Sequence, residues 1–264
     1  MNTSHSAALA LAEEVPVALV FNGITHAVMM ASPTDLEDFA LGFALTEGLL
    51  QTPSQLYDVD TEVLAQGIEV RLEVAAQAEQ VLKERRRSMA GRTGCGLCGA
   101  DSLGQVRLAL PQAPSVTITT SAMFKAHGML RSQQPEKQRT GATHAAAWAD
   151  LNGHILLVRE DVGRHNALDK LIGALVKTNQ DMQAGFICIT SRASFEMVQK
   201  TVKSGAGVLT AVSAPTSLAV DLAQDHNLLL AALVRDNNFT AYSHGHRLIT
   251  SSVHTTTEEV HHGH

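Results

Sequence analysis

The fold is decided by residues 185–234, GFICITSRASFEMVQKTVKSGAGVLTAVSAPTSLAVDLAQDHNLLLAALV, in which short apolar segments alternate with amphipathic ones. The apolar segments GFICIT, VLTAVSA and LLLAALV are rich in aliphatic residues, which predicts strands. The segments between them predict helices, and Ser194 and Thr216 fit their N-caps. This alternation is typical of a layered α/β sheet, and continuous apolar strands indicate a sheet covered on both faces.

The same pattern extends to both sides of this run. Upstream, HILLVRE (154–160) predicts a strand, and Asn166 and Asp169 fit the cap of a helix that follows it. The apolar face of that helix is formed by Leu168, Leu171, Ile172 and Leu175. Downstream, FTAYS (239–243) predicts a last strand. We therefore expect an α/β domain over residues 114–264.

The first 90 residues carry a different pattern. VPVALVFNGITHAVMM (15–30) predicts two strands around an Asn-Gly turn, which is a strong hairpin signal. A helix is expected next, with Ser32 as its N-cap and Gly48 at its end. GIEVRLEV (67–74) alternates as a strand does. These elements predict a small N-terminal α/β domain at residues 1–90.

The bulk composition excludes several classes of protein. The chain has 264 residues, 45% hydrophobic and 17% charged, which is ordinary for a globular protein. Its formal net charge of −6 argues against a nucleic-acid partner. The N-terminus has no basic segment before its apolar run, and no run reaches the roughly 20 apolar residues of a membrane span. Three cysteines make no disulfide framework, so we expect a cytoplasmic protein without a membrane partner.

Between the two patterns the chain changes character, from Val81 to Gly99. VLKERRRSMA is basic, GRTGCGLCG is rich in glycine, and neither is periodic. We therefore expect an irregular connection here, and we assign residues 91–113 to a flexible segment between the domains. This segment holds Cys95 and Cys98 as a Cys-x-x-Cys pair.

Three chemistries fit such a pair on a glycine-rich loop. It could bind zinc, but a closed site needs about four ligands, so His127, His144 or His165 would have to complete it. It could cycle between dithiol and disulfide. It could also accept a sulfane sulfur, since basic residues nearby favour the reactive thiolate. The residues alone leave these three open, whereas Cys188, inside an apolar run, is expected to be buried.

Polar turns follow four of the predicted strands. They are EDVGRHNALDKLIG (160–173), which carries a dense cluster of polar residues from Glu160 to Lys170, TSRAS (190–194), SAPTS (213–217) and VRDNN (234–238). In open α/β sheets, ligands bind at the carboxyl ends of strands, beside helix N-termini that suit phosphate. Arg164, Arg192 and Arg235 add bidentate phosphate partners. Ordinary turns and caps would explain each segment alone, but together they predict one edge that binds an extended anionic ligand.

Several segments together resemble the formate dehydrogenase accessory sulfurtransferase family, also called FdhD/NarQ. SPTDLEDFALGFALTEGLL, the GCGLCG loop and EDVGRHNALDK resemble its signatures and follow in the same order. THAAA, SFEMVQK and SAPTSLA resemble its C-terminal signatures. The resemblance covers nearly the whole chain.

The resemblance implies a fold and a reaction. The fold would be a small N-terminal α/β-roll domain followed by a cytidine-deaminase-like three-layer α/β/α domain. The protein would be a sulfurtransferase: a cysteine desulfurase would load a persulfide onto Cys95, with Cys98 assisting. The sulfur would pass to the molybdenum bis(molybdopterin guanine dinucleotide) cofactor, which is then inserted into the catalytic subunit of formate dehydrogenase.

The resemblance also implies where the cofactor binds. Carried over by position, the contacts fall on Leu233, Val234, Arg235, Asp236, Asn237 and Asn238. The family often has Phe at the first of these positions and glycine later, so the individual contacts are open, as is the oligomeric state, with a homodimer as one option.

Two other functions stay open. One is a zinc-dependent, deaminase-like hydrolase, although such enzymes use His-x-Glu and here His144 is followed by Ala145 and Ala146. The other is a chaperone that binds the cofactor without transferring sulfur.

Overall fold

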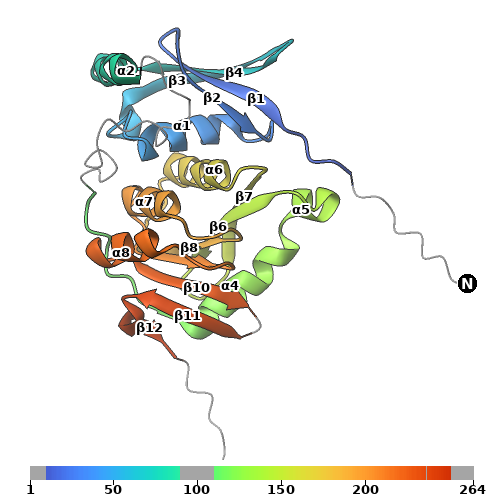
Figure 1. The fold of residues 1–264 in the computed structure, drawn as a ribbon, viewed down its shortest axis with the longest axis vertical. Helices are drawn as coiled ribbons and strands as arrows, with labels where there is room; N and C mark the ends of the chain where they lie inside the picture. The colour runs from blue at the N-terminus through green and yellow to red at the C-terminus, as the bar shows by residue number, and fades with distance from the viewer. Residues whose placement is uncertain (1–9, 90–109, 236, 251–264) are drawn as a thin grey trace, which may run out of the picture.

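The computed structural model describes residues 10–89, 110–235 and 237–250. Two sheets lie one above the other, and helices fill the space between them (Figure 1). The predicted domain boundaries at 90 and 113 stay predictions, because residues 90–109 lie outside the described part.

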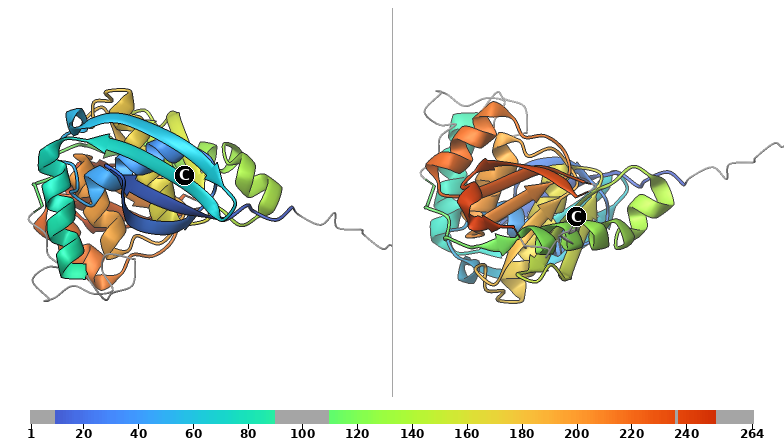
Figure 2. Two further views of the ribbon diagram at one scale, coloured as in Figure 1. Left: turned by 90° about the horizontal axis from the view of Figure 1, so that it is seen from above. Right: turned by 90° about the horizontal axis from the view of Figure 1, so that it is seen from below.

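The small sheet is formed by the N-terminal strands. It consists of β1 (Val15–Phe21), β2 (Ile24–Ala31), β3 (Leu56–Leu64) and β4 (Gly67–Val74), in the order β2-β1-β4-β3. The predicted hairpin is confirmed: Asn22 and Gly23 have φ values of 45° and 77°, as a type I′ turn requires. The sheet covers α1 (Leu36–Thr46), as the view from above shows (Figure 2), and η1 (Pro53–Gln55) precedes β3.

The predicted N-cap at Ser32 is wrong, because α1 begins only at Leu36, with Asp35 as its cap residue. Ser32 is buried and is used elsewhere. Its N–H donates to Asp161, and its hydroxyl accepts from the N–H of Val162. A contact 130 residues away in the chain has therefore replaced the local cap.

The predicted irregular connection is wrong for its first part, since α2 (Ala76–Met89) includes Val81 to Met89. Gln, Glu, Leu, Lys and Arg are good helix formers, so this polar run has no need of an amphipathic pattern to form a helix. Ala78 and Leu82, four residues apart, anchor it in the core of the small sheet. The second part of the predicted connection, residues 90–99, lies outside the described residues.

The large sheet has the order β11-β10-β9-β8-β6-β7. Its strands are β6 (His144–Asp150), β7 (Ile155–Asp161), β8 (Gly185–Ile189), β9 (Val208–Ala211), β10 (Leu229–Arg235) and β11 (Asn238–Ser243). The five strands expected from the sequence are confirmed. The alanine-rich β6 was not predicted, because HAAAWAD lacks the β-branched residues typical of strands.

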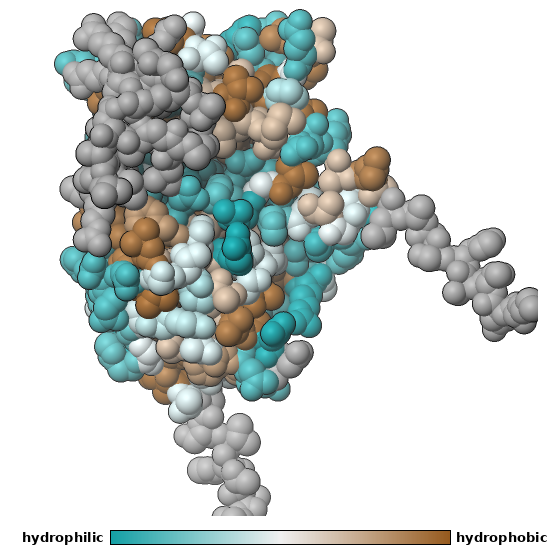
Figure 3. Space-filling model, viewed as in Figure 1, coloured by the Kyte–Doolittle hydropathy of each residue, from teal (hydrophilic) through white to brown (hydrophobic). Residues whose placement is uncertain are grey.

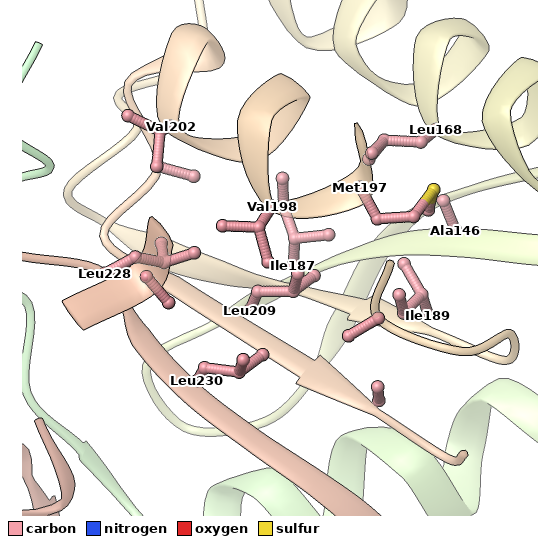
Figure 4. Close-up of a cluster of buried hydrophobic side chains, with 14 of the residues drawn as sticks. Ala146, Leu168, Ile187, Ile189, Met197, Val198, Val202, Leu209, Leu228 and Leu230 are labelled. Carbon is pink, nitrogen blue, oxygen red and sulfur yellow. The ribbon is translucent and has the colours of Figure 1, made fainter. Parts of the chain in front are cut away.

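Helices cover both faces of the large sheet, so the expected three-layer α/β/α arrangement is confirmed. One face carries α6 (Arg164–Lys177), α7 (Phe195–Ser204) and α8 (Ser217–Asp225), whose apolar side chains share a core with those of β8 to β10. Figure 4 shows this core where α6 and α7 meet the strands. The other face carries α4 (Thr120–Ser132), followed by the short α5 (Pro135–Thr140). β5 (Ile118–Thr119) pairs with β12 (Leu248–Ile249), which follows η2 (Gly245–Arg247).

The cap predicted before α6 is wrong. The helix begins at Arg164 after Gly163, so Asn166 and Asp169 lie inside it. Both side chains are buried: the amide of Asn166 donates to the carbonyl of Met30, and Asp169 pairs with Lys200. The predicted cap positions of Ser194 and Thr216 are confirmed, although neither side chain makes a capping hydrogen bond to the described residues.

The two halves of the molecule are joined by the close packing of α1 on α6. A Cβ atom added to Gly42 would lie 1.8 Å from the carbonyl oxygen of Asp169, and one added to Gly173 would lie 1.9 Å from that of Asp38. Only glycine allows the two backbones to approach this closely. The small and large sheets are therefore held at a fixed distance by two residues without side chains.

His127 makes the stability of the fold depend on pH. Its Nε2 lies 2.8 Å from Oγ1 of Thr210 in the core under α4, and burial lowers the pKa of the imidazole to about 4. The unfolded chain, with an ordinary pKa of about 6.5, therefore takes up the proton first as the pH falls. This contribution to stability is complete above pH 6.5 and is lost between 6.5 and 4.

We expect the free energy of unfolding to fall by about 2 kcal/mol more between pH 7 and pH 5 in the wild type than in His127→Gln. The glutamine keeps a polar partner for Thr210 but has no proton to gain. Denaturant unfolding of both proteins at the two pH values measures the difference. An equal fall in both would contradict the assignment to His127.

Candidate functional site

The carboxyl ends of β7, β8, β9 and β10 lie at one edge of the large sheet, which we call the rim. β8, β9 and β10 are parallel, and β7 has the same direction because β6 is antiparallel to both β7 and β8. The turns after β8 and β9 are themselves paired through Ala193 and Pro215. The four polar turns of the sequence thus share an edge, on the right of the large sheet in Figure 1.

The three arginines lie along this rim. Arg164 opens α6 after β7, Arg192 is exposed in the turn after β8, and Arg235 is exposed at the end of β10. With β9 and β6 between these strands, the rim from β7 to β10 spans four strand spacings, or about 19 Å. That length suits an extended ligand rather than a single phosphate.

The stretch assigned to cofactor contacts, Leu233 to Asn238, forms the end of β10 and the turn into β11. Leu233 has a φ of 59°, and it is the one aliphatic residue with positive φ in the described chain. The register with β11 shifts between Ala232 and Arg235, so a bulge accompanies the strain. Such strain is concentrated at binding sites. Val234 is buried, Asn237 and Asn238 are exposed, and Asp236 lies outside the described residues.

The dense cluster of polar residues from 160 to 170 separates into two groups. Glu160 accepts from the N–H groups of Glu136 and Lys137 and caps α5. Asp161 and Lys170 form a fully buried ion pair, 2.7 Å apart. Glu160, Asp161 and Lys170 therefore act as a helix cap and a buried ion pair that support the fold. Arg164 and the following histidine keep partial exposure at the rim.

Among the buried side-chain atoms without a hydrogen-bond partner in the described part of the chain, two at the rim have no ion-pair partner either. They are Nε of Arg164, at the start of α6, and Oγ of Ser194, the cap residue of α7, whereas Nε2 of His165 lies beside Glu196. Buried polar groups are nearly always paired, so such atoms indicate a missing partner. A bound anion at these two helix N-termini would supply acceptors for both.

A histidine–glutamate pair joins the same two helices. Nε2 of His165 lies 2.6 Å from Oε2 of Glu196, and the hydrogen bond with His165 lowers the pKa of Glu196. Both side chains are about 30% exposed, so solvent or a ligand can reach them. The sequence analysis considered His165 as a possible metal ligand and as part of the polar segment after the HILLVRE strand. It missed Glu196, whose one signal was its place in the first turn of a helix that follows a strand.

His144 also lies at the rim, at the start of β6 opposite Asp161. Burial lowers its pKa, and the nearby charges of Lys137 and Arg164 lower it further. We therefore expect a neutral imidazole at pH 7, able both to donate and to accept a hydrogen bond. The sequence analysis considered His144 only as a zinc ligand and did not predict its place at the rim.

Cys95 and Cys98 lie outside the described residues. Cys188 is fully buried in β8, as expected, and burial raises the pKa of its thiol to about 12. Within residues 10–89, 110–235 and 237–250, no three His, Cys, Asp or Glu side chains form a group that could hold a metal ion.

No helix in the described part of the chain has both the length and the apolar character to cross a membrane. On the face seen in Figure 3, apolar residues form separate patches among hydrophilic ones.

Comparisons with known proteins cover almost the whole chain. A family model described as the FdhD/NarQ family matches residues 12–249. Proteins named sulfur carrier protein FdhD from Cupriavidus necator and Variovorax paradoxus are each 56% identical over 239 residues, which is 90% of this chain and 83% and 86% of theirs.

A solved structure from Desulfotalea psychrophila, described as a formate dehydrogenase accessory protein, has a similar fold. Its TM-score is 0.72 and it covers 90% of each chain at 21% identity, so it supports the fold alone.

The thiol of Cys188 is predicted to be inert in the folded protein. At pH 8 a thiol with a pKa of about 12 is almost entirely protonated, and burial excludes reagents. The native wild type and native Cys188→Ala should therefore give the same number of thiols with an aromatic disulfide reagent, and the unfolded wild type should give one more than unfolded Cys188→Ala. An extra fast thiol in the native wild type relative to native Cys188→Ala would contradict the burial.

Proposed function

The chain belongs to the FdhD/NarQ family, and on that premise we propose that it is a sulfur carrier that holds a persulfide on Cys95. One observation carries the proposal: the curated relatives at 56% identity are named sulfur carriers, and of the three cysteines Cys188 is too deeply buried to serve. The Cys95/Cys98 pair is then the place for the sulfur. Sulfur transfer thereby becomes the favoured one of the three chemistries open to that pair.

A cysteine desulfurase is the proposed donor. The thiolate of Cys95 attacks the outer sulfur of the persulfide on the donor, the new S–S bond forms, and the donor cysteine leaves as a thiolate. No external oxidant is consumed, because a sulfane sulfur moves between two thiols. Cys98 follows Cys95 by three residues in the sequence, and we propose that it assists the transfer or relays the sulfur.

The proposed acceptor is the molybdenum bis(molybdopterin guanine dinucleotide) cofactor, bound as a substrate along the rim. Its pyrophosphates suit arginines and helix N-termini. The buried, unpartnered atoms of Arg164 and Ser194 support this fit, as does the backbone strain at Leu233. Arg192 and Arg235 would extend the grip along the sheet. The client proposed for the sulfurated cofactor is the catalytic subunit of formate dehydrogenase.

A chaperone that binds the cofactor without carrying sulfur is the second candidate. The rim supports it as well as it supports the carrier, because the features of the rim concern only the ligand. Sulfur loading therefore distinguishes the two functions.

We expect the protein to gain the mass of one sulfur atom after incubation with a cysteine desulfurase and cysteine. Intact-mass spectrometry detects the gain, and a reductant should reverse it. Cys95→Ala should abolish it, and Cys188→Ala, the matched control, should load like the wild type. No gain in the wild type would favour the chaperone.

We also expect guanosine diphosphate to bind as a mimic of one end of the cofactor. Arg164→Gln, Arg192→Gln and Arg235→Gln should each weaken binding about tenfold, because a charge-assisted hydrogen bond contributes roughly 1.5–3 kcal/mol. Calorimetry measures the dissociation constants.

Two controls accompany this measurement. Lys125→Gln removes an exposed cation that contacts His154 beyond the far end of β6, so it should bind the nucleotide like the wild type. Cys95→Ala should do the same. Unchanged affinity in all three arginine variants would show that the ligand lies elsewhere.

A further inference from the structure

The turn that leads from β7 into α6 is tied to the small sheet through one carboxylate. Asp161 accepts four hydrogen bonds. Oδ1 takes the N–H of Gly163 at 2.7 Å and the amide of Asn166 at 2.9 Å, both from its own half of the molecule. Oδ2 takes the ammonium of Lys170 at 2.7 Å and the N–H of Ser32 at 3.0 Å.

Ser32, at the end of β2, closes this network from the other half. Its carbonyl accepts from Nζ of Lys170 at 3.0 Å, and its hydroxyl accepts from the N–H of Val162 at 3.2 Å. Lys170 and Asp161 are 0% exposed. These two residues contact the backbone N–H and carbonyl of residue 32, so the serine side chain itself contributes the hydrogen bond from the N–H of Val162. Without the hydroxyl, that partly buried N–H loses its acceptor in the small sheet.

The turn held in this way sets the rim. Val162 and Gly163 are followed directly by Arg164 and His165, so their backbone determines where the guanidinium and imidazole begin. The turn packs closely against its own helix, since a Cβ added to Gly163 would lie 2.8 Å from the side-chain amide nitrogen of Asn166. From the other half of the molecule, the hydroxyl of Ser32 holds the N–H of Val162 in the same turn.

We propose that Ser32 is a positioning residue for the rim: through Asp161 and Val162, the small sheet fixes the first turn of α6 for binding of a phosphate-bearing ligand. The small sheet then contributes to ligand binding, although Arg164, Arg192 and Arg235 all belong to the half that contains the large sheet. This inference rests on the proposed function, since it takes the rim as the ligand site.

The experiment uses the full-length protein and guanosine diphosphate as the probe. Ser32→Ala removes the hydroxyl that accepts from Val162 and should weaken nucleotide binding about five- to tenfold. Ser32→Thr keeps the hydroxyl and should bind within about twofold of the wild type. Lys177→Gln is the matched control, because Lys177 also joins the two halves, through Glu37 and Asp38, but at the far end of α6. It should bind like the wild type.

Each outcome decides one point. If Ser32→Ala binds like the wild type, or if Ser32→Thr loses as much affinity as Ser32→Ala, the positioning role is wrong. If Lys177→Gln loses as much affinity, any loosening of the two halves has the same effect, and the specific role of Ser32 is also wrong. If the wild type itself binds no nucleotide, the rim is not the site. That result contradicts the proposed ligand, and with it the positioning role of Ser32. Sulfur loading of Ser32→Ala should stay normal, which keeps the carrier function separate.

Discussion

The close contact between α1 and α6 is the constraint on which the rest of the structure depends. Gly42 and Gly173 let each helix backbone touch the other, and a single methyl group at either position would push the sheets apart. The polar contacts between the halves are made over short distances that only this approach allows. Lys200 reaches Thr46 and Glu47 of the C-terminal turn of α1, both at 2.9 Å.

Buried charges then make the fixed approach specific. Burial alone would lower the pKa of Lys200, yet Asp169 and Glu47 together raise it above its ordinary value, so the ammonium stays charged. A buried ion pair contributes little net stability, but removing one partner leaves an isolated charge and is strongly destabilising. Lys170 and Asp161 follow the same rule at the other end of the interface. The buried ion pairs thus specify one relative arrangement of the two halves, and they add little to the free energy of unfolding.

The buried pair of Asp169 and Lys200 is related to the rim by the helical repeat. His165 and Asp169 are one helical turn apart on α6, and Glu196 and Lys200 are one turn apart on α7, so a His–Glu pair and an Asp–Lys pair lie along the seam between the helices. The outer pair is partly exposed and the inner pair is buried. A ligand at the rim would therefore meet groups whose positions are set by the packing of α1, α6 and α7.

The sequence by itself determined five of the six strands of the large sheet, the N-terminal hairpin, the layered class and the family, because these depend on local periodicity, turn chemistry and contiguous motifs. It also indicated which turns meet at the rim, since parallel strands place their carboxyl ends together. It failed where a distant partner replaced a local one: Ser32 and Asp169 fit helix caps by composition, but they bind groups more than 100 residues away or on another helix. Only the tertiary structure decided which polar residues of the 160–170 cluster are buried supports and which remain open to a ligand, because burial and pairing arise from the packing of α1 on α6.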